Sequence, residues 1–274
     1  MQTLDVDDWP SFEKKLQELQ RAEVSAGSTA EFLFRGVTDS TFPLATTLER
    51  RAHEGIQICD YFKLILELKP QIESFTGASW ETPKYRDVEK SLQDYNTFMF
   101  DQVPDPPTYS YMLYLRHHGF PSPLLDWTRS PYIAAFFAFR SATKPANCKV
   151  SIYVLLPNRL YRHTKSNGKP WIRRIGPYVT THRRHFLQQG DYTMCAVFNI
   201  GEQPRFSKHE DVVFCGDTHP EIIWKLNIPW AERLKVLKTL DSYNLNEFSL
   251  FESVEALMET LAVREIEFGA KRQW

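Results

Sequence analysis

Cysteine is scarce in this chain of 274 residues, and its spacing suits neither a metal site nor a disulfide framework. The four cysteines stand far apart and form no Cys-x-x-Cys pair; they are Cys59, Cys148, Cys195 and Cys215. Zinc sites and small disulfide-stapled domains need closer and more regular spacing. We therefore expect free thiols in a reducing cytoplasm and no structural metal.

Long apolar runs and an excess of charge of one sign are also missing. No stretch approaches the roughly 20 consecutive apolar residues that a membrane-spanning helix needs. The first residues, MQTLDVDDWP, are acidic and lack the basic and apolar regions of a signal peptide, so we expect a cytoplasmic protein. The formal net charge is −1, which gives no global basic field for nucleic acid or an anionic membrane.

Apolar residues recur at helical spacing in some segments and alternate in others, which predicts an α+β fold. We expect a mainly helical N-terminal half to pack on a mixed sheet from the C-terminal half. Pro70 is expected to end or kink its helix. Helices are predicted over 12–22, 48–75, 88–100, 109–119, 132–142, 231–243 and 250–268, and strands over 29–37, 123–127, 149–157, after 190 and over 221–229. We divide the chain into an N-terminal helical segment, 1–30, and a single domain, 31–274.

The segment HHGFPSPLLDWTRSPYIAAFFAF, residues 117–139, places polar side chains between two apolar runs. Ser130 followed by Pro131 is a favourable start for a helix. A strand leading into a helix N-terminus leaves backbone N–H groups free, which suits an anion. Asp126, Thr128 and Ser130 are therefore candidate ligand-binding residues. The alternative is that Ser130 only caps the helix and Asp126 only accepts backbone N–H bonds.

Phe34-Arg35-Gly36 stands at the end of a predicted strand. A guanidinium there can grip a phosphate with two N–H groups. Gly36, which has no side chain, lets a ligand or another backbone come close. The alternative is a structural Arg35 that pairs with Asp126 or with a helix C-terminus.

Other polar residues are candidates for catalysis. His117 or His118 can act as an acid or base, and we choose His118, although a buried histidine that only orders its loop has the same signature. A glutamine before Gly190 can position a nucleobase, an amide or an attacking water, so Gln188 and Gln189 are candidates beside a polar-loop alternative. Glu221, at a predicted strand start, is a candidate general base or a carboxylate that stabilises a cationic transition state. The alternative is an exposed charge at the end of a strand. Three aromatic residues are candidate platforms for a flat ring: Trp127, Tyr132 and Tyr192.

Three stretches together resemble the FRG family, named for its Phe-Arg-Gly signature. Phe34-Arg35-Gly36 is the first, and the second is His117 to Pro131, similar to the family's His-x-Gly-x-Pro-Thr-x-Leu-Leu-Asp-x-Thr-x-Ser-Pro motif. Ser122 stands where threonine is usual and keeps a hydroxyl. The third, Arg184 to Tyr192, resembles an Arg-x-x-x-Gln-x-Gly-x-aromatic pattern. The resemblance spans roughly residues 31–260 and implies a fold more than a chemistry.

The order of these residues also resembles that of ADP-ribosyltransferases. In that class an arginine anchors NAD, a Ser/Thr-bearing strand supports the nicotinamide ribose, and a late Glu or Gln stabilises the cationic transition state. The resemblance implies NAD as substrate and a macromolecular acceptor, in a toxin or defence effector. The chain departs from the pattern, since Gln189-Gly190-Asp191 is the nearest approach to Gln-x-Glu. A non-enzymatic nucleotide-binding module and a nucleotide or phosphodiester hydrolase stay open.

Overall fold

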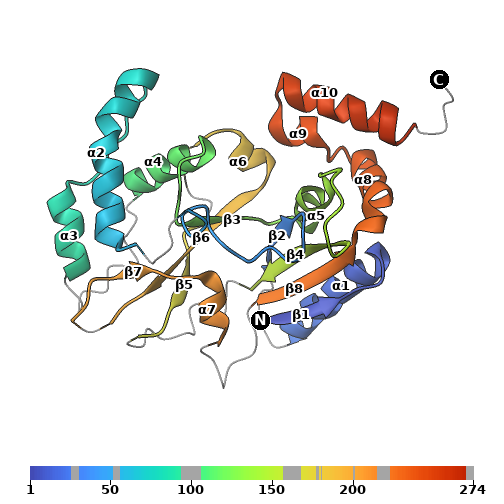
Figure 1. The fold of residues 1–274 in the computed structure, drawn as a ribbon, viewed down its shortest axis with the longest axis horizontal. Helices are drawn as coiled ribbons and strands as arrows, with labels where there is room; N and C mark the ends of the chain where they lie inside the picture. Colours follow the sequence, from blue (N-terminus) through green and yellow to red (C-terminus); the bar gives the residue numbers. More distant parts are fainter. Residues whose placement is uncertain are drawn as a thin grey trace.

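A computed structural model describes residues 1–25, 31–51, 56–93, 106–156, 168–176, 179, 181–199, 201–214 and 223–269. In these ranges the chain forms helices α1 to α10 and a mixed sheet of eight strands, so the predicted α+β class is confirmed (Figure 1). None of the helices described is both long and apolar enough to cross a membrane.

The sheet has the strand order β1-β8-β4-β2-β3-β6-β5, and β7 pairs with β6. Only β1 and β8 run parallel among the described pairs. The strands are β1 (Gln2–Asp5), β2 (Leu33–Val37), β3 (Leu124–Thr128), β4 (Lys149–Leu155), β5 (Trp171–Arg174), β6 (Gly190–Val197), β7 (Arg205–Phe206) and β8 (Ile223–Pro229). Strands β1 to β3 come from the N-terminal half, so the sheet draws on both halves of the chain.

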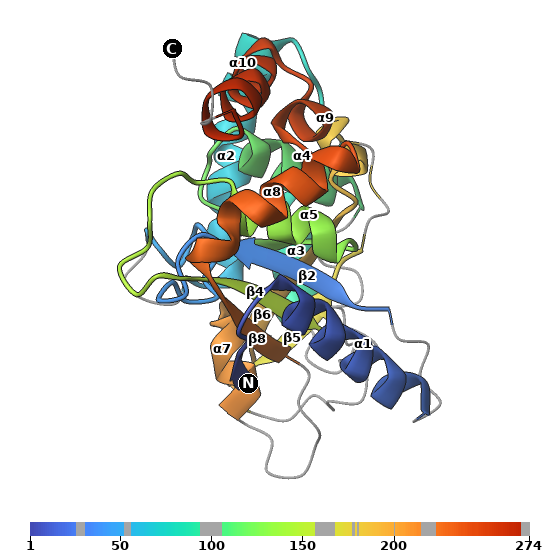
Figure 2. The ribbon, with the colours of Figure 1, turned by 90° about the vertical axis from the view of Figure 1, so that its right-hand side faces the viewer.

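Two groups of helices cover the same face of the sheet, one toward each edge (Figures 1 and 2). Phe34, Thr128 and Gly190 are register partners across β2, β3 and β6, and partners share a face. On that face α1 (Trp9–Ser25), α5 (Pro131–Phe139) and α8 (Arg233–Ser242) bury one apolar cluster against β2, β4 and β8. The helices α2 (Ile58–Thr76) and α4 (Pro106–His117) bury a second cluster against β3 and β6.

The opposite face of the sheet carries a third apolar cluster, which includes Leu33, Leu125, Trp127 and Tyr153. Helix α7 (His209–Phe214) contributes Val212 to this cluster. The remaining helices pack around these layers, and α3 (Tyr85–Gln93) and α9 (Glu247–Phe251) add Val88 and Leu250 to the two helix clusters. The others are α6 (Arg184–Leu187), α10 (Val254–Ala262), and the short turns Trp230–Glu232 and Val263–Glu267.

Two predicted helices have different bounds in the structure, and the first of them starts at Ile58 rather than at residue 48. Helix α2 runs through Pro70 and ends at Thr76, where Gly77 adopts a left-handed φ of 70°. The tail is two helices rather than one, because Glu252 has a left-handed φ of 48° and ends α9. Ser253 then caps α10 by accepting a hydrogen bond from the backbone N–H of Ala256. This break brings α9 and α10 side by side over α5 and α8 (Figure 1).

Candidate functional site

Strands β2 and β3 meet at a single residue pair, and the opening beside that pair is the floor of the candidate site. Phe34 opposite Thr128 is the pair described between them. By contrast, β2 with β4 and β3 with β6 each form ladders of five pairs. A continued ladder would set Gly36 opposite Asp126. The sheet instead opens there, on the face that lies between the two helix groups.

Arg35 turns its guanidinium into this opening. Its Nη1 donates to the backbone carbonyl oxygen of Asp126 at 2.8 Å and lies 3.8 Å from the carboxylate Oδ2 of the same residue. The side chain therefore supplies a hydrogen-bond donor where a neighbouring strand would have supplied one. Burial lowers the pKa of Arg35 to about 10, partly offset by Asp126, so the guanidinium stays charged at neutral pH. The contact between Arg35 and Asp126 is the structural pairing that the sequence offered as an alternative to phosphate binding.

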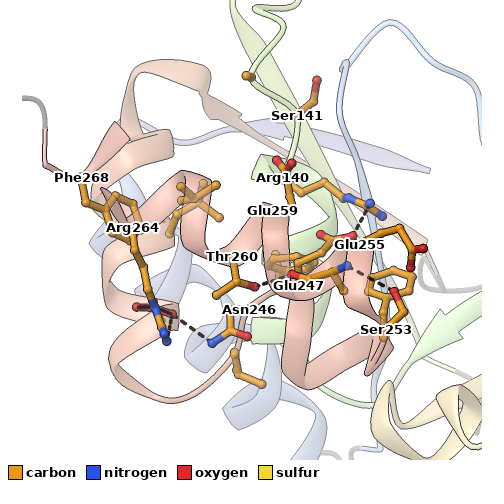
Figure 3. A pocket seen from close by; sticks show the side chains of 18 of the residues that line it. Arg140, Ser141, Asn246, Glu247, Ser253, Glu255, Glu259, Thr260, Arg264 and Phe268 are labelled. Atoms are coloured by element: carbon orange, nitrogen blue, oxygen red, sulfur yellow. Dashed lines mark hydrogen bonds and ion pairs between the residues drawn. The ribbon is translucent and has the colours of Figure 1, made fainter. Parts of the chain in front are cut away.

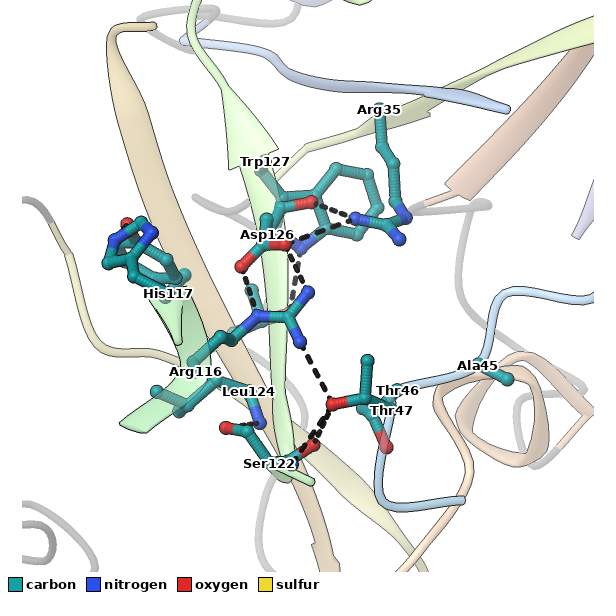
Figure 4. A network of polar contacts seen from close by, with 12 residues as sticks. Arg35, Ala45, Thr46, Thr47, Arg116, His117, Ser122, Leu124, Asp126 and Trp127 are labelled. Atoms are coloured by element: carbon teal, nitrogen blue, oxygen red, sulfur yellow. Dashed lines mark hydrogen bonds and ion pairs between the residues drawn. The ribbon is translucent and has the colours of Figure 1, made fainter. Parts of the chain in front are cut away.

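Asp126 forms its main ion pair with Arg116, at the end of α4 (Figure 4). The guanidinium of Arg116 donates to both carboxylate oxygens through Nε and Nη2, and its Nη1 donates to Thr47 Oγ1 at 3.0 Å. Burial raises the pKa of Asp126, but the charge and hydrogen bonds of Arg116 outweigh it, so the pKa lies below its ordinary value. The carboxylate is thus a charged group, and its side chain is 42% exposed.

A tyrosine hydroxyl between two imidazoles forms the next part of the site. Tyr192 Oη lies 3.3 Å from His117 Nε2 and 3.2 Å from His185 Nδ1, and the His185 ring stacks on the tyrosine ring. Burial lowers the pKa of His117 and raises that of Tyr192. Both groups are consequently neutral at pH 7, and His117 is available as a proton acceptor.

These groups surround a cavity of about 360 Å³. Its volume lies in the lower part of the range of about 300–1,000 Å³ typical of small-molecule sites. The sheet supplies Arg35, Asp126, Thr128 and Tyr192, α5 supplies Phe137, and Arg140 directly follows that helix. His117, His185 and Gln188 close the other side. In the described part of the chain, no three His, Cys, Asp or Glu side chains are placed to hold a metal ion.

The cavity brings together seven of the sequence-predicted site residues: Arg35, Gly36, Asp126, Trp127, Thr128, Gln188 and Tyr192. Gly36 is required by close packing against α5. A Cβ atom there would lie 1.9 Å from the carbonyl oxygen of Ala134 and 2.7 Å from the backbone nitrogen of Ala138. Another backbone, rather than a ligand, therefore makes the close approach that the glycine permits.

Ser130 caps α5 and does not line the cavity. Its Oγ accepts a hydrogen bond from the backbone N–H of Ile133 at 3.3 Å, with Pro131 at the first helical position. The hydroxyl of Thr128 accepts a bond from the Ser130 N–H at 3.2 Å. Side chains of the chain itself thus satisfy donors at this helix start, where the sequence suggested an anion site.

The candidate catalytic residues separate in space. Gln188 lines the cavity, but its Nε2 donates to the carbonyl oxygen of Leu250 at 3.1 Å. Gln189 is exposed, with a left-handed φ of 47°. His118 is also exposed and lies against Tyr114, so its neighbour His117 is the histidine of the cavity. Glu221 lies outside the described residues.

Sequence reasoning missed Arg116, Arg140 and the role of His185. Arg116 directly precedes the His-His pair, and its place in the last turn of α4 was the available signal. Arg140 directly follows α5, and no motif marked it. His185 belongs to the Arg184-to-Tyr192 pattern, which assigned it no role. The Arg140 contact joins elements 107 residues apart, whereas Arg116 and His185 reach partners within ten residues that lie on a separate strand.

Residues 30–147 match the family model of the FRG domain. This match supports the sequence resemblance to the FRG family over these residues. The matched region contains β2, β3, α4 and α5 and so supplies Arg35, Arg116, Asp126 and Arg140. It is narrower than the range of the sequence resemblance, and Gln188 and Tyr192 lie outside it. No curated protein and no solved structure matches the chain.

Proposed function

We propose that the cavity binds a nucleotide and that the protein is an NAD-consuming enzyme of the ADP-ribosyltransferase type. The observation that carries the proposal is the convergence of Arg35, Asp126 and Tyr192 on one cavity from three separate strands. The region that matches the FRG model supplies two of these strands, and β6 supplies the third. The volume of the cavity suits one nucleoside, which we take to be the nicotinamide riboside half of NAD.

The proposed chemistry uses groups that face the cavity. The bond between nicotinamide and C1′ of the ribose breaks, and its electron pair leaves with nicotinamide. The positive charge that develops on the ribose lies next to the carboxylate of Asp126, which stabilises it. An acceptor hydroxyl, amine or water then attacks C1′ and passes its proton to the neutral imidazole of His117.

A matched pair of tyrosine substitutions tests this function. Y192F removes the hydroxyl between the two imidazoles, whereas Y109F removes a buried hydroxyl that donates to the carbonyl of Gly176. With NAD labelled in the nicotinamide, we expect the wild-type protein to release nicotinamide. The Tyr192 hydroxyl positions the base His117, and general acid–base catalysis contributes about 100-fold or more, so Y192F should slow steady-state nicotinamide release by at least about tenfold. Y109F should leave the rate nearly unchanged at a temperature where both variants are folded.

The absence of both NAD binding and nicotinamide release by the wild-type protein would refute the proposal. Equal slowing by Y192F and Y109F would show that the loss is structural.

We place the protein in the cytoplasm, where NAD and a macromolecular acceptor are both present. Fractionation of cells that express the protein tests this localisation.

A second candidate function is binding without reaction. It is favoured by the ion pair with Arg116, which already neutralises Asp126, and by the bond that holds the Gln188 amide to Leu250. A binding module would retain NAD unchanged over hours. Calorimetry followed by chromatography of the recovered nucleotide therefore separates the two functions.

A further inference from the structure

A second and larger cavity lies beside the first, over the C-terminal end of α5. Its volume is about 740 Å³, and α8, α9 and α10 form its walls (Figure 3). Phe136, Leu237, Phe251 and Phe268 give it an apolar lining. The proposed function leaves this cavity unused, although its volume exceeds that of a nucleoside.

The two cavities share two lining residues, Thr38 and Arg140. Arg140 forms an ion pair with Glu247 at 2.5 Å, and its guanidinium lies 5.0 Å from the ring centre of Phe251 and 5.9 Å from that of Phe137. Phe137 lines the first cavity and Phe251 the second. Arg140 therefore stands where the cavities meet, and its side chain is 39% exposed.

The polar lining of the second cavity is acidic. Arg264 pairs with Asp241, and Arg140 pairs with Glu247. The further carboxylates, Glu255 and Glu259, form no ion pair with any residue in the described ranges. Such a lining can accept hydrogen bonds from ribose hydroxyls and an amino group, but it repels an additional phosphate.

We propose that the two cavities together bind one dinucleotide, with its diphosphate held by Arg140 where they meet. This inference rests on the proposed function, since the nicotinamide riboside half occupies the first cavity. The second nucleoside half occupies the second cavity, where aromatic rings stack with its base and carboxylates accept from its sugar hydroxyls. The site therefore prefers NAD to mononucleotides and NAD to NADP, which carries an extra phosphate on that half.

The test measures the binding of four probes by calorimetry: NAD, NADP, nicotinamide mononucleotide and nicotinamide riboside. NAD is expected to bind about tenfold or more tightly than NADP, because an additional phosphate beside the carboxylates of Glu255 and Glu259 costs at least about one order of magnitude. The mononucleotide is expected to bind more weakly than NAD but more tightly than the riboside, which has no phosphate for Arg140.

Two variants separate the contribution to binding of Arg140, where the cavities meet, from that of the second cavity. R140A should weaken NAD and the mononucleotide about tenfold or more, the loss expected for a charge-assisted contact, and should leave the riboside within about twofold. A142W places an indole at an exposed position that lines only the second cavity of the two. It should weaken NAD and leave the mononucleotide unchanged. R205A is the control, because Arg205 is a similarly exposed arginine paired with Glu202 and lies outside both cavities.

The outcomes separate this inference from the proposed function. Equal affinities for NAD and the mononucleotide, or equal effects of R140A and R205A, would overturn the two-cavity site and leave nucleotide binding in the first cavity intact. Tighter binding of NADP than NAD would overturn the placement of the second nucleoside among the carboxylates. Failure of all four probes to bind would refute both the inference and the proposed function.

Discussion

Polar side chains on the two sides of strand β3 differ in charge and in exposure to solvent. On one side Asp126 faces the cavity, charged and partly exposed, between the guanidinium groups of Arg116 and Arg35. On the other side the Trp127 indole donates to Thr193 Oγ1 at 2.8 Å, and that hydroxyl lies 2.9 Å from Nε2 of His209. His209 is fully buried, and burial lowers its pKa to about 3.

The difference shows that a buried group keeps its charge here where an opposite charge lies beside it, as buried Asp191 also does next to Arg174 on the Trp127 side. A carboxylate is tolerated at the opening of the sheet because two arginines and the cavity compensate for its lost hydration. On the Trp127 side, no carboxylate of the described residues pairs with His209, so the imidazole stays neutral, and its Nδ1 has no hydrogen-bond partner among them. We therefore expect substitutions on the cavity side to change charge pairing and ligand binding, and substitutions on the Trp127 side to change pH dependence.

The largest expected effect comes from D126A. Removal of the carboxylate leaves Arg116, whose side chain is 9% exposed, without its partner. Breaking a buried ion pair costs about 3–5 kcal/mol, and the partial exposure of Asp126 places the loss near the lower end. Urea unfolding of D126A measures the loss. If D126A is as stable as the wild-type protein, the ion pair does not hold the opening together.

The double variant R116A/D126A sharpens this result. Since the single substitution leaves an unpaired buried charge, removing both partners is expected to cost less than the sum of the two single losses. Additive losses in the same unfolding experiment would show that the two side chains act independently.

The pH dependence of stability tests the buried side of β3, where Trp127, Thr193 and His209 lie. The pKa of His209 in the folded protein lies below its value of about 6.5 in the unfolded chain, so the unfolded chain binds more protons between the two values. The free energy of unfolding should fall by about 1.4 kcal/mol for each pH unit below about 6.5. H209Q should flatten this slope, leaving a smaller one from His117 and His182, whose pKa values are also lowered. An unchanged slope would contradict the assignment to His209.

The smallest expected effect is that of S130A. Loss of this N-cap should cost about 1 kcal/mol of stability and leave NAD affinity unchanged, because Ser130 faces the helix backbone and not the cavity. Thermal unfolding and calorimetry measure the two quantities. If S130A lowers NAD affinity without lowering thermal stability, Ser130 contacts the ligand after all.

Local patterns predicted much of the fold and part of the site. The strand 123–127, the Ser130 cap and the helix after it depend on neighbouring residues, and the structure has them at β3 and α5. Arg35 and Asp126 were predicted as a possible pair. The role of Arg140 was not predictable, because it arises where α5 meets α9 more than 100 residues later in the chain. The choice of His118 over His117 failed to identify the cavity residue because helix phase at the end of α4 decides it.

The most direct measurement of the central claim is a crystal structure of the protein soaked with NAD. The account predicts the nicotinamide ribose in the opening between β2 and β3, beside Asp126 and Tyr192, with the diphosphate at Arg140. NAD bound elsewhere on the molecule, with this opening filled only by water, would contradict it.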